Sequence, residues 1–533
     1  MARKYWTLGL VSVATFMLLL DITVVNTALP AIREDLDATF TDLQWVIDAY
    51  ALTLAAFVLV AGSLADRLGR RRVFAAGIVI FTISSLVAGF AGDPTTLNVA
   101  RAVQGVGGAV MFAVSLALIA QEFPPGRERG TAMGVYGATI GAAVAIGPLI
   151  GGALTDGIGW ESVFFLNVPI GIAALFVTYW QVRESRDPEA TRIDWAGVAT
   201  FSLSLFLLVL ALLRGNEEGW GSTLIVGLFA GSVVLMAAFV VAELRVREPM
   251  LPLHLFKNRS FTGVQIAAFG VSSTLFALFL YLTFYLQNFL GFSPLEAGLR
   301  YLPITITSFF AAILGGALIG RVPARVLMGV ALGGVGLSLI LMNGVGLDSE
   351  WTTLLAGFIV GGVAVGLLNP VVADTAVSVV PTRVSGMAAG INDTFRQVGV
   401  AVGIAAWGAV FIGVGKGEVA SQVAGTPLAE GDAPRELVEA ISAGALPEVL
   451  EAVPPEFRDQ VQLAAQEGFL AGFNEILLLA GLLAFATAIA AFWLVRESDI
   501  AREEIAEPSK VADEATATTT GPDGTAEPAV EPA

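Results

Sequence analysis

The amino-acid sequence predicts an all-α integral membrane protein with fourteen transmembrane helices. The first observation is composition: 56% of the 533 residues are hydrophobic and 14% are charged, whereas a soluble domain carries about 25% charged residues. The second is a series of apolar runs, most of them near the roughly 20 residues that a helix needs to cross a bilayer. These observations exclude a soluble protein.

The apolar runs alternate with short polar connectors. The first run follows the basic start Met1–Lys4 and is interpreted as an uncleaved helix, because it is too long for a signal peptide and lacks a small-residue cleavage site. An even number of crossings puts both termini on one side of the membrane. The runs are approximately 5–29, 45–64, 73–91, 97–121, 131–155, 162–182, 195–213, 221–242, 261–290, 297–320, 324–346, 351–373, 385–414 and 468–495.

The chemistry open to the chain is limited by the absence of cysteine and by a single histidine, His254. Disulfides, thiolate metal sites and cysteine nucleophiles are therefore excluded, and the sequence contains no Ser/His/Asp set, metal-ligand cluster or phosphate loop. The net charge of −17 comes mostly from the hydrophilic segments 415–468 and 496–533, where it indicates solvation. We expect no enzyme activity, cofactor, metal or nucleic-acid partner.

A basic connector between the second and third runs fixes the orientation of the chain. Four arginines lie within residues 62–72, and short arginine-rich loops stay in the cytoplasm. This predicts a multi-pass plasma-membrane protein with both termini cytoplasmic. The connector resembles the loop signature G-x-L-A-D-R-x-G-R-[RK] of the major facilitator superfamily, which implies a conformational switch. Its candidate residues are Gly62, Asp66, Arg67, Gly69, Arg70 and Arg71.

An internal repeat divides the chain. The connector sequence recurs 254 residues later, at 316–325, with Gly320 in place of Asp66, and the pair Pro124 and Gly130 recurs as Pro381 and Gly386, at offsets of 257 and 256. Two six-helix halves around an inserted helix pair, a 6+2+6 order, fit the parallel repeats of that superfamily. The predicted parts are an N-terminal half 1–192, an inserted pair with its linker 193–259, a C-terminal half 260–495 with an acidic extracellular loop 415–468, and a disordered acidic cytoplasmic tail 496–533.

A charged residue at membrane depth is costly and marks a functional site by default. Asp21 lies about two-thirds of the way along the first run, within Leu20–Pro30. This stretch resembles the signature L-D-x-T-[IV]-V-N-x-A-L-P of the fourteen-helix drug:proton antiporter family (EmrB/QacA-like multidrug exporters). We expect Asp21 to be the principal proton-coupling group, and Asn26 to be a polar residue of the central cavity.

Asp48 and Arg101 lie at a depth comparable with that of Asp21, because each is a few residues from the outer end of its run. The stretch from Arg101 resembles the superfamily motif R-x-x-Q-G-x-G, whose arginine is implicated in proton coupling, and Gln104 of this motif is expected in the central cavity. An adjacent arginine and burial shift the pKa of a carboxyl in opposite directions, which would tune Asp21 or Asp48. A purely structural Asp–Arg pair is the alternative for both.

The fifth run carries a glycine motif that resembles the antiporter signature G-x-x-x-G-P-x-x-G-G, which marks exporters rather than importers. Small residues let helices approach closely, and a proline permits a kink. Plain helix packing explains the same composition, so the export direction comes from the resemblance alone. The motif residues are Gly141, Gly147, Pro148, Gly151 and Gly152.

The C-terminal half contributes three further charged candidates. Asp393 and Arg396 are three residues apart and share a helix face, so they either line the central cavity or neutralise each other. Glu475 lies seven or eight residues inside the last run without a local basic neighbour. It is either a proton-coupling group or a structural residue.

The resemblance covers about residues 5–495. It implies proton-coupled export of amphiphilic, in particular cationic, small organic molecules by alternating access, with the proton gradient as the energy source. The alternative is a dedicated exporter of one metabolite, siderophore or antibiotic made by the host. The expected partners are the substrate, protons and membrane lipid, and the chain is expected to work as a monomer. Richness in alanine, arginine and glycine points to a bacterial source.

Overall fold

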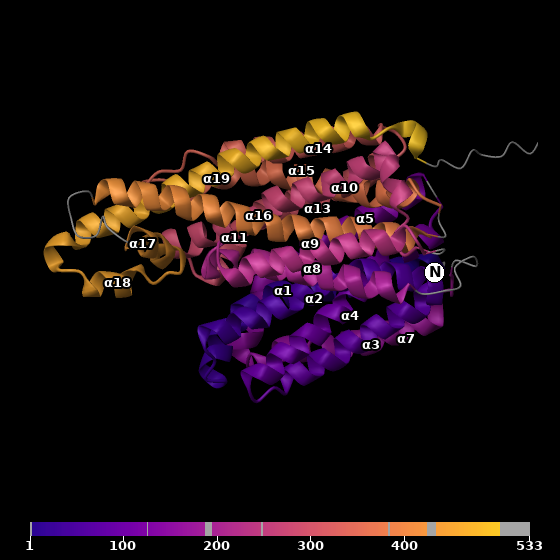
Figure 1. The fold of residues 1–533 in the computed structure, drawn as a ribbon, viewed down its shortest axis with the longest axis horizontal. Helices are drawn as coiled ribbons and strands as arrows, with labels where there is room; N and C mark the ends of the chain where they lie inside the picture. The colour runs from indigo at the N-terminus through magenta and orange to yellow at the C-terminus, as the bar shows by residue number, and fades with distance from the viewer. Residues whose placement is uncertain are drawn as a thin grey trace, which may run out of the picture.

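The computed structural model describes residues 3–124, 126–186, 194–246, 249–381, 384–423 and 433–500. Apart from one isolated bridge between Ile319 and Val322, the regular elements of these residues are helices. Most of them run side by side along one elongated bundle (Figure 1). The predicted all-helical fold class is confirmed.

The helices of the N-terminal part follow the predicted runs, and capping residues set several of their boundaries. Thr39 and Asp42 form a capping box at the start of the second helix, and Asp93 caps the fourth, with Pro94 at its first position. Hydrogen bonds from Thr96 hold the pKa of the Asp93 carboxyl below its usual value. The elements are α1 (Arg3–Asp35), α2 (Phe40–Leu68), α3 (Arg70–Gly89), α4 (Pro94–Glu122), α5 (Arg127–Gly157), α6 (Glu161–Phe165) and α7 (Asn167–Gln181).

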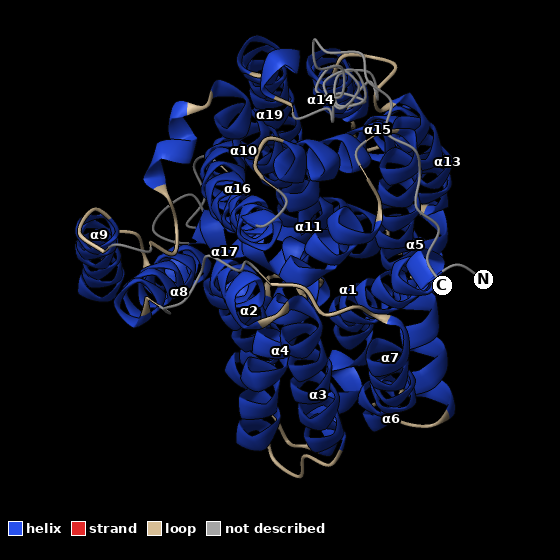
Figure 2. Cartoon of the chain, turned by 90° about the vertical axis from the view of Figure 1, so that its right-hand side faces the viewer, coloured by secondary structure: helices blue, strands red, loops and turns tan. Residues whose placement is uncertain are grey.

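The inserted pair, α8 (Trp195–Glu218) and α9 (Thr223–Glu243), forms a hairpin on one side of the bundle (Figure 2). The Ser204 and Ser232 hydroxyls join the two helices, because each donates to the other residue's carbonyl, at 2.8 and 2.9 Å. α8 packs against α2 and against α16 (Ser385–Gln422), whereas α9 is mostly exposed. The hairpin therefore covers the seam between α2 and α16.

The C-terminal part contains two departures from regular α-helix. The ninth run is built from α10 (Arg259–Val271) and α11 (Ala277–Phe284), each followed by a π-helical turn, η2 (Ser272–Phe276) and η3 (Tyr285–Phe289). Such turns are rare and are often found at functional sites. The other elements are η1 (Leu253–Lys257), α12 (Pro294–Arg300), α13 (Leu302–Leu318), α14 (Ala324–Met342), η4 (Trp351–Leu354), α15 (Leu355–Ser378), α17 (Ala433–Ser442), α18 (Leu446–Ala452), η7 (Pro455–Phe457), α19 (Arg458–Leu494) and η8 (Glu497–Asp499).

Each of the predicted apolar runs lies mainly within helical structure. Among the described residues, twelve helices are long and apolar enough to cross a membrane, and α13 is apolar but shorter. α5 is 31 residues long and coincides with the fifth run. The molecule is a multi-pass membrane protein, and the number of fourteen crossings stays a prediction.

The acidic segment 415–468 is largely helical where it is described. α16 continues to Gln422, and α17 and α18 lie at the end of the bundle farthest from the N-terminus (Figure 1). α17 buries Leu437, Val438 and Ile441 and contacts α16 and α19. Residues 424–432, and all of the predicted disordered tail beyond residue 500, lie outside the described residues.

Two glycine contacts join the first and last parts of the bundle, near the ends of the helices that lie beside the N-terminus. A Cβ added to Gly62 of α2 would overlap the carbonyl oxygen of Gly386 of α16, and a Cβ added to Gly316 of α13 would overlap that of Gly130 of α5. In the internal repeat, Gly62 corresponds to Gly316 and Gly130 to Gly386. The two contacts are therefore repeat-related copies of one backbone-to-backbone approach.

Candidate functional site

A buried polar cluster surrounds Asp21 in the first half of the bundle. Its fully buried carboxylate accepts hydrogen bonds from Arg101 at 2.5 Å, from Gln104 at 2.8 Å and from Asn167 at 2.9 Å. The Ser85 hydroxyl accepts from the amides of Gln104 and Asn167, at 3.3 and 3.0 Å. We name these five residues the Asp21 cluster. Because they come from α1, α3, α4 and α7, the cluster as a whole ties four helices together.

Arg101 is held on several sides within this cluster. Its Nε donates to the Val46 carbonyl of α2 at 2.9 Å, its Nη1 also donates to Gln104 at 2.7 Å, and its guanidinium lies 4.3 Å from the centre of the Tyr50 ring. Removing one partner of a buried ion pair costs about 3–5 kcal/mol, because the other charge is left uncompensated. A change in the charge of Asp21 must therefore alter the interactions that Arg101 makes with α2 and within α4.

Asp48 and Asn26 do not belong to the Asp21 cluster. Trp45 of α2 faces α8, since the guanidinium of Arg214 lies 5.0 Å from its ring centre. Asp48 is three residues further on and shares that face. It is half-buried, and Asn26 is exposed on α1. Counting residues along a helix gives the depth of a side chain but not the direction in which it points.

Glu475 lies near one end of the bundle. Its chain neighbour Asn474 accepts hydrogen bonds from the backbone N–H groups of Gly344 and Val345, at 2.7 and 3.1 Å, in the connector that follows α14. α19 begins at Arg458, so nearly five turns of this helix precede this level. Glu475 is half-buried at this level. It lies close to the end of α14, whereas its position in the apolar run predicted a place seven or eight residues inside.

A second polar group lies between the two halves. Asp393 of α16 is 2% exposed, and among the described residues its Oδ2 atom has no hydrogen-bond partner. Arg396, one turn further on, donates to Oδ1 of Asn369 on α15 at 2.9 Å. Two small cavities, of about 10 and about 40 Å³, adjoin these residues and share Ile140 and Asn369 in their walls. Asp393 thus presents an unsatisfied acceptor beside the space between the halves.

Aromatic rings form much of the remaining wall of these cavities. Phe112 and Tyr136 come from the first half, and Phe276 and Phe279 come from the second half. Phe276 belongs to the π-turn η2. Predominantly apolar and aromatic walls with a few placed polar groups are typical of sites for small organic ligands.

Asp66 connects the basic connector to the opposite half of the molecule. Its carboxylate accepts two hydrogen bonds from Arg70, at 2.8 and 3.0 Å, and one each from the backbone N–H groups of Gly386 and Met387, at 3.1 and 2.8 Å. The first N–H groups of a helix have no partner within it and carry the positive end of its dipole. We name this contact between Asp66 and the start of α16 the Asp66 latch.

The rest of the connector packs against two linkers. Gly69 has a φ of 111°, a conformation that favours glycine, and a Cβ there would approach Oε1 of Glu184 to 2.6 Å. Glu184 follows α7; its carboxylate accepts from the backbone N–H of Arg71 at 3.1 Å and lies 3.8 Å from Nε of the same residue. Arg67 donates to the carbonyl of Pro249, after α9, at 3.0 Å. The connector therefore touches the first half, the inserted hairpin's linker and, through Asp66, the second half.

The glycine motif of α5 is divided between two surroundings. A Cβ at Gly147 would overlap the Thr23 hydroxyl of α1, and a Cβ at Gly151 would overlap that of Thr27. These two glycines let α5 approach the stretch of α1 that also carries Asp21. The two sequence motifs are thus in direct contact.

The other motif residues of α5 do not make this approach. A Cβ at Gly141 would be in ordinary contact with Ser308, at 3.6 Å, and one at Gly152 would have no atom within 4 Å. Pro148 lies within α5, but its side chain is outside the described part of the structure. Close helix packing accounts for only part of the motif.

Comparison with known proteins decides the family. The model of the Major Facilitator Superfamily matches residues 11–404. The chain belongs to the major facilitator superfamily. It is therefore a membrane transporter, and the expectation that it is not an enzyme is confirmed.

Relatives of this superfamily member include named resistance proteins. It is 33% identical over 529 residues to the tetracenomycin C resistance and export protein of Streptomyces glaucescens, covering 96% of this chain and 95% of the relative. It is 34% identical over 406 residues to the multidrug resistance protein Stp of Mycobacterium tuberculosis, covering 76% and 75%. The human organic anion transporter MFSD10 shares its fold, with a TM-score of 0.62 over 93% of this chain and 100% of that one, at 14% identity.

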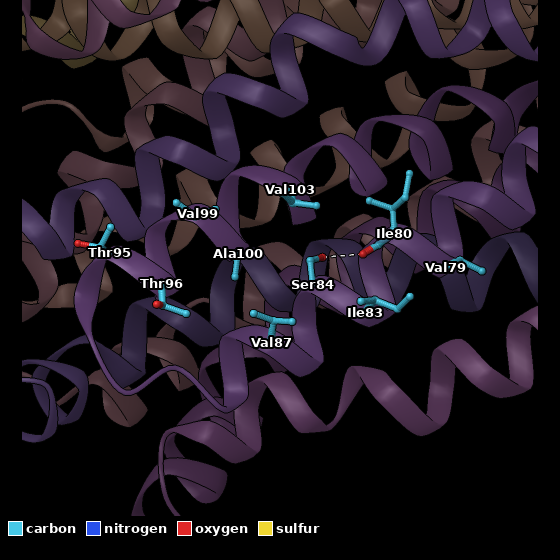
Figure 3. A pocket seen from close by; sticks show the side chains of 10 residues that line it. All are labelled: Val79, Ile80, Ile83, Ser84, Val87, Thr95, Thr96, Val99, Ala100 and Val103. Atoms are coloured by element: carbon cyan, nitrogen blue, oxygen red, sulfur yellow. Dashed lines mark hydrogen bonds between the residues drawn. The ribbon is translucent and has the colours of Figure 1, made fainter.

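In this transporter an apolar groove of about 470 Å³ opens on the outside of the first half, between α3 and α4 (Figure 3). Ser84 lies within the groove, but its hydroxyl already donates a hydrogen bond within α3, to the Ile80 carbonyl at 2.7 Å. Val79, Ile83 and Val99 are exposed along it. A surface of this kind suits lipid tails, so we do not include it in the site.

Sequence reasoning did not find two members of the Asp21 cluster. Asn167 is an amide in the interior of the sixth apolar run, and that isolation is a signal that could have found it. Ser85 is one of several hydroxyls in the third run and carries no such signal. Among the described residues, no group of three or more His, Cys, Asp or Glu side chains could hold a metal ion.

Proposed function

We propose that this superfamily member exports amphiphilic small molecules in exchange for protons, using the proton gradient and no cofactor. The observation that carries the proposal is the Asp21 carboxylate, which is fully buried and held by Arg101, Gln104 and Asn167. A proton that reaches Asp21 cancels its charge and leaves Arg101 buried without a counter-ion. The helices around the pair must then repack.

The substrate binds between the halves, beside Asp393. The unsatisfied Oδ2 atom of this carboxylate binds a positively charged group of the substrate. The neighbouring aromatic rings contact the apolar part of the substrate. Cavities of about 10 and about 40 Å³ are far smaller than the roughly 300–1,000 Å³ of a typical ligand site. The halves must therefore separate before a substrate enters.

Alternating access follows from where the halves are in contact. The backbone contacts Gly62–Gly386 and Gly130–Gly316, here called the glycine seams, and the Asp66 latch close the end of the bundle at which α1 begins. The arginines of the connector put this end in the cytoplasm of a bacterial cell, with both termini. The state described here is then closed toward the cytoplasm, and one chain contains the whole pathway.

Replacing Asp21 tests the proposal. Asp21→Asn keeps the volume but cannot take up a proton, so a pH gradient imposed on proteoliposomes should no longer drive uphill transport, while substrate binding is retained. Asp21→Glu should keep part of the activity. Asp48→Asn and Glu475→Gln are the controls and should remain coupled. Uphill transport with proton exchange by Asp21→Asn would refute the assignment.

A dedicated exporter of one endogenous product is the second candidate. The observation that favours it is that the relative matched over nearly the whole chain is named for a single antibiotic. Everted vesicles challenged with cationic dyes and with neutral antibiotics separate the two functions. Transport of several unrelated compounds supports the multidrug exporter, and transport of one narrow class supports the dedicated exporter.

A further inference from the structure

Two buried carboxylates meet at the base of the inserted hairpin. Asp194 precedes α8 and Glu243 ends α9, and they are 7% and 5% exposed. Oδ1 of Asp194 accepts from the N–H of Gly197 at 2.8 Å, and Oε2 of Glu243 accepts from the N–H of Leu251 at 3.2 Å. The other oxygen of each carboxylate is buried and has no hydrogen-bond partner among the described residues. The two orphaned atoms are Oδ2 of Asp194 and Oε1 of Glu243.

These two oxygens border the same small space. A Cβ added to Gly197 would overlap Oδ2 of Asp194 and would lie 2.9 Å from Oε1 of Glu243. A side chain at position 197 would fill the space, so glycine is needed there. Both unsatisfied oxygens therefore lie within 2.9 Å of one point, and a single donor placed there would reach both of them.

A metal ion does not fit this space. Ca²⁺ takes about 6–8 oxygen ligands, and the part of the chain that the structure describes brings two unsatisfied oxygens to this space. Besides Asp194, the charged group that acts on Glu243 is Arg67 of α2, which already donates to the carbonyl of Pro249. Two like charges removed from water and close together do not both stay ionised. A proton satisfies both oxygens and removes one charge.

We propose that Asp194 and Glu243 bind one proton between them, in a site separate from the Asp21 cluster. The proton resides on one of the two orphaned oxygens and forms an O–H···O hydrogen bond to the other. When it is lost, both groups are carboxylates and repel each other. The start of α8 is then pushed away from the end of α9.

The site adjoins the Asp66 latch. Arg67 is the chain neighbour of Asp66, and it binds Pro249, which is two residues from the Leu251 amide that holds Glu243. α8 packs against both α2 and α16, which the latch joins. Loss of the shared proton therefore loosens the latch. The end of the bundle at which α1 begins then opens more readily as the pH rises.

Infrared spectroscopy of the purified, substrate-free protein tests the shared proton. A pH titration should show the C=O band of one protonated carboxylic acid that is absent from both Asp194→Asn and Glu243→Gln. Asp194→Asn keeps the Oδ1 acceptor and supplies an amide donor toward Glu243, so it should fold. Glu218→Gln, at the exposed far end of α8, should keep the band. A band that persists in either variant overturns the proposal.

Cysteine labelling tests the link to the latch. The chain has no cysteine, and Ser385, at the start of α16, is fully buried. The labelling rate of Ser385→Cys, divided by that of the denatured protein at the same pH, should rise with pH in the parent background and stay constant with Asp194→Asn. An unchanged pH dependence with Asp194→Asn refutes the link. Neither measurement uses substrate, so each is independent of the role of Asp21.

Discussion

The two acids assigned to transport differ in how their oxygens are satisfied. Asp21 accepts from three side chains, whereas Oδ2 of Asp393 has no partner among the described residues. A buried acceptor without a donor costs free energy, and a ligand that supplies the donor recovers it. We therefore propose that Asp21 takes up the proton and changes its bonds to neighbouring side chains, whereas Asp393 contacts the substrate.

Asp393→Asn should separate cationic from neutral substrates. Hydrogen bonds to charged groups contribute about 1.5–3 kcal/mol, so kcat/KM for a cationic substrate should fall about 10- to 100-fold. A neutral substrate of similar size should change little. Initial rates of both in proteoliposomes measure the difference, with Glu475→Gln as an acid outside the cavity. An equal loss for both substrates would contradict the assignment.

At the residue scale, the sequence predicted the members of the site that belong to motifs. Asp21 and Arg101 do lie together. Gln104, which was expected in the central cavity, bonds to both of them instead and does not line either cavity between the halves. Asn167 joins them because of how α7 packs against α1, which is a tertiary contact that a single sequence does not contain. Asp48 is not among the partners of this cluster; it shares a face of α2 with Trp45, whose ring meets Arg214 of α8. Periodicity predicts which residues share a face, but not what that face meets.

At the scale of the elements, the motif of α1 and the glycine motif of α5 pack against each other and form one helix–helix interface. The glycines Gly147 and Gly151 of α5 receive the hydroxyls of Thr23 and Thr27 of α1. Each hydroxyl donates to a carbonyl of its own helix, so both hydroxyls are satisfied at this contact. The position of Asp21 on α1 is therefore fixed partly by α5.

Gly151→Ala and Gly152→Ala should have opposite effects on stability. The added methyl at position 151 would overlap Thr27, and overpacking costs about 1–3 kcal/mol. The methyl at position 152 meets nothing, so it should stabilise the helix by about 0.5–1 kcal/mol. Thermal unfolding in detergent measures both. Adding Thr27→Ala to Gly151→Ala should restore most of the loss, and equal effects at the two positions would contradict the interface.

Helix positions were predictable from the apolar runs, but several helix ends were not. α16 and α19 extend well past the runs 385–414 and 468–495, into the acidic segment. Hydropathy marks only the part of a helix that suits lipid. The outer parts are stabilised by packing against the apolar face of α17, and such packing becomes visible only when the helices are placed together.

For the whole molecule, the internal repeat explains both a symmetry and an exception to it. The seams Gly62–Gly386 and Gly130–Gly316 are repeat-related, but among the described residues a carboxylate is hydrogen-bonded across the first of them alone, that of Asp66. Gly320, with a φ of 79°, stands where Asp66 stands in the first copy. Both copies make a turn after the seam, so the acid is not required for the turn. Its additional role is to hold the two halves together.

Asp66→Asn should therefore open the latched end without unfolding the protein. The substitution removes the negative charge that Arg70 and the first N–H groups of α16 share. A loss of about 1.5–3 kcal/mol of charged hydrogen bonding should raise the labelling rate of Ser385→Cys about 10- to 100-fold and slow transport, because closure of this end becomes unfavourable. Asp93→Asn is the matched control, since asparagine caps a helix as well as aspartate does and α4 begins at the opposite end of the bundle. Labelling and transport that both stay at the parent values with Asp66→Asn would show that the glycine seams alone keep this end closed.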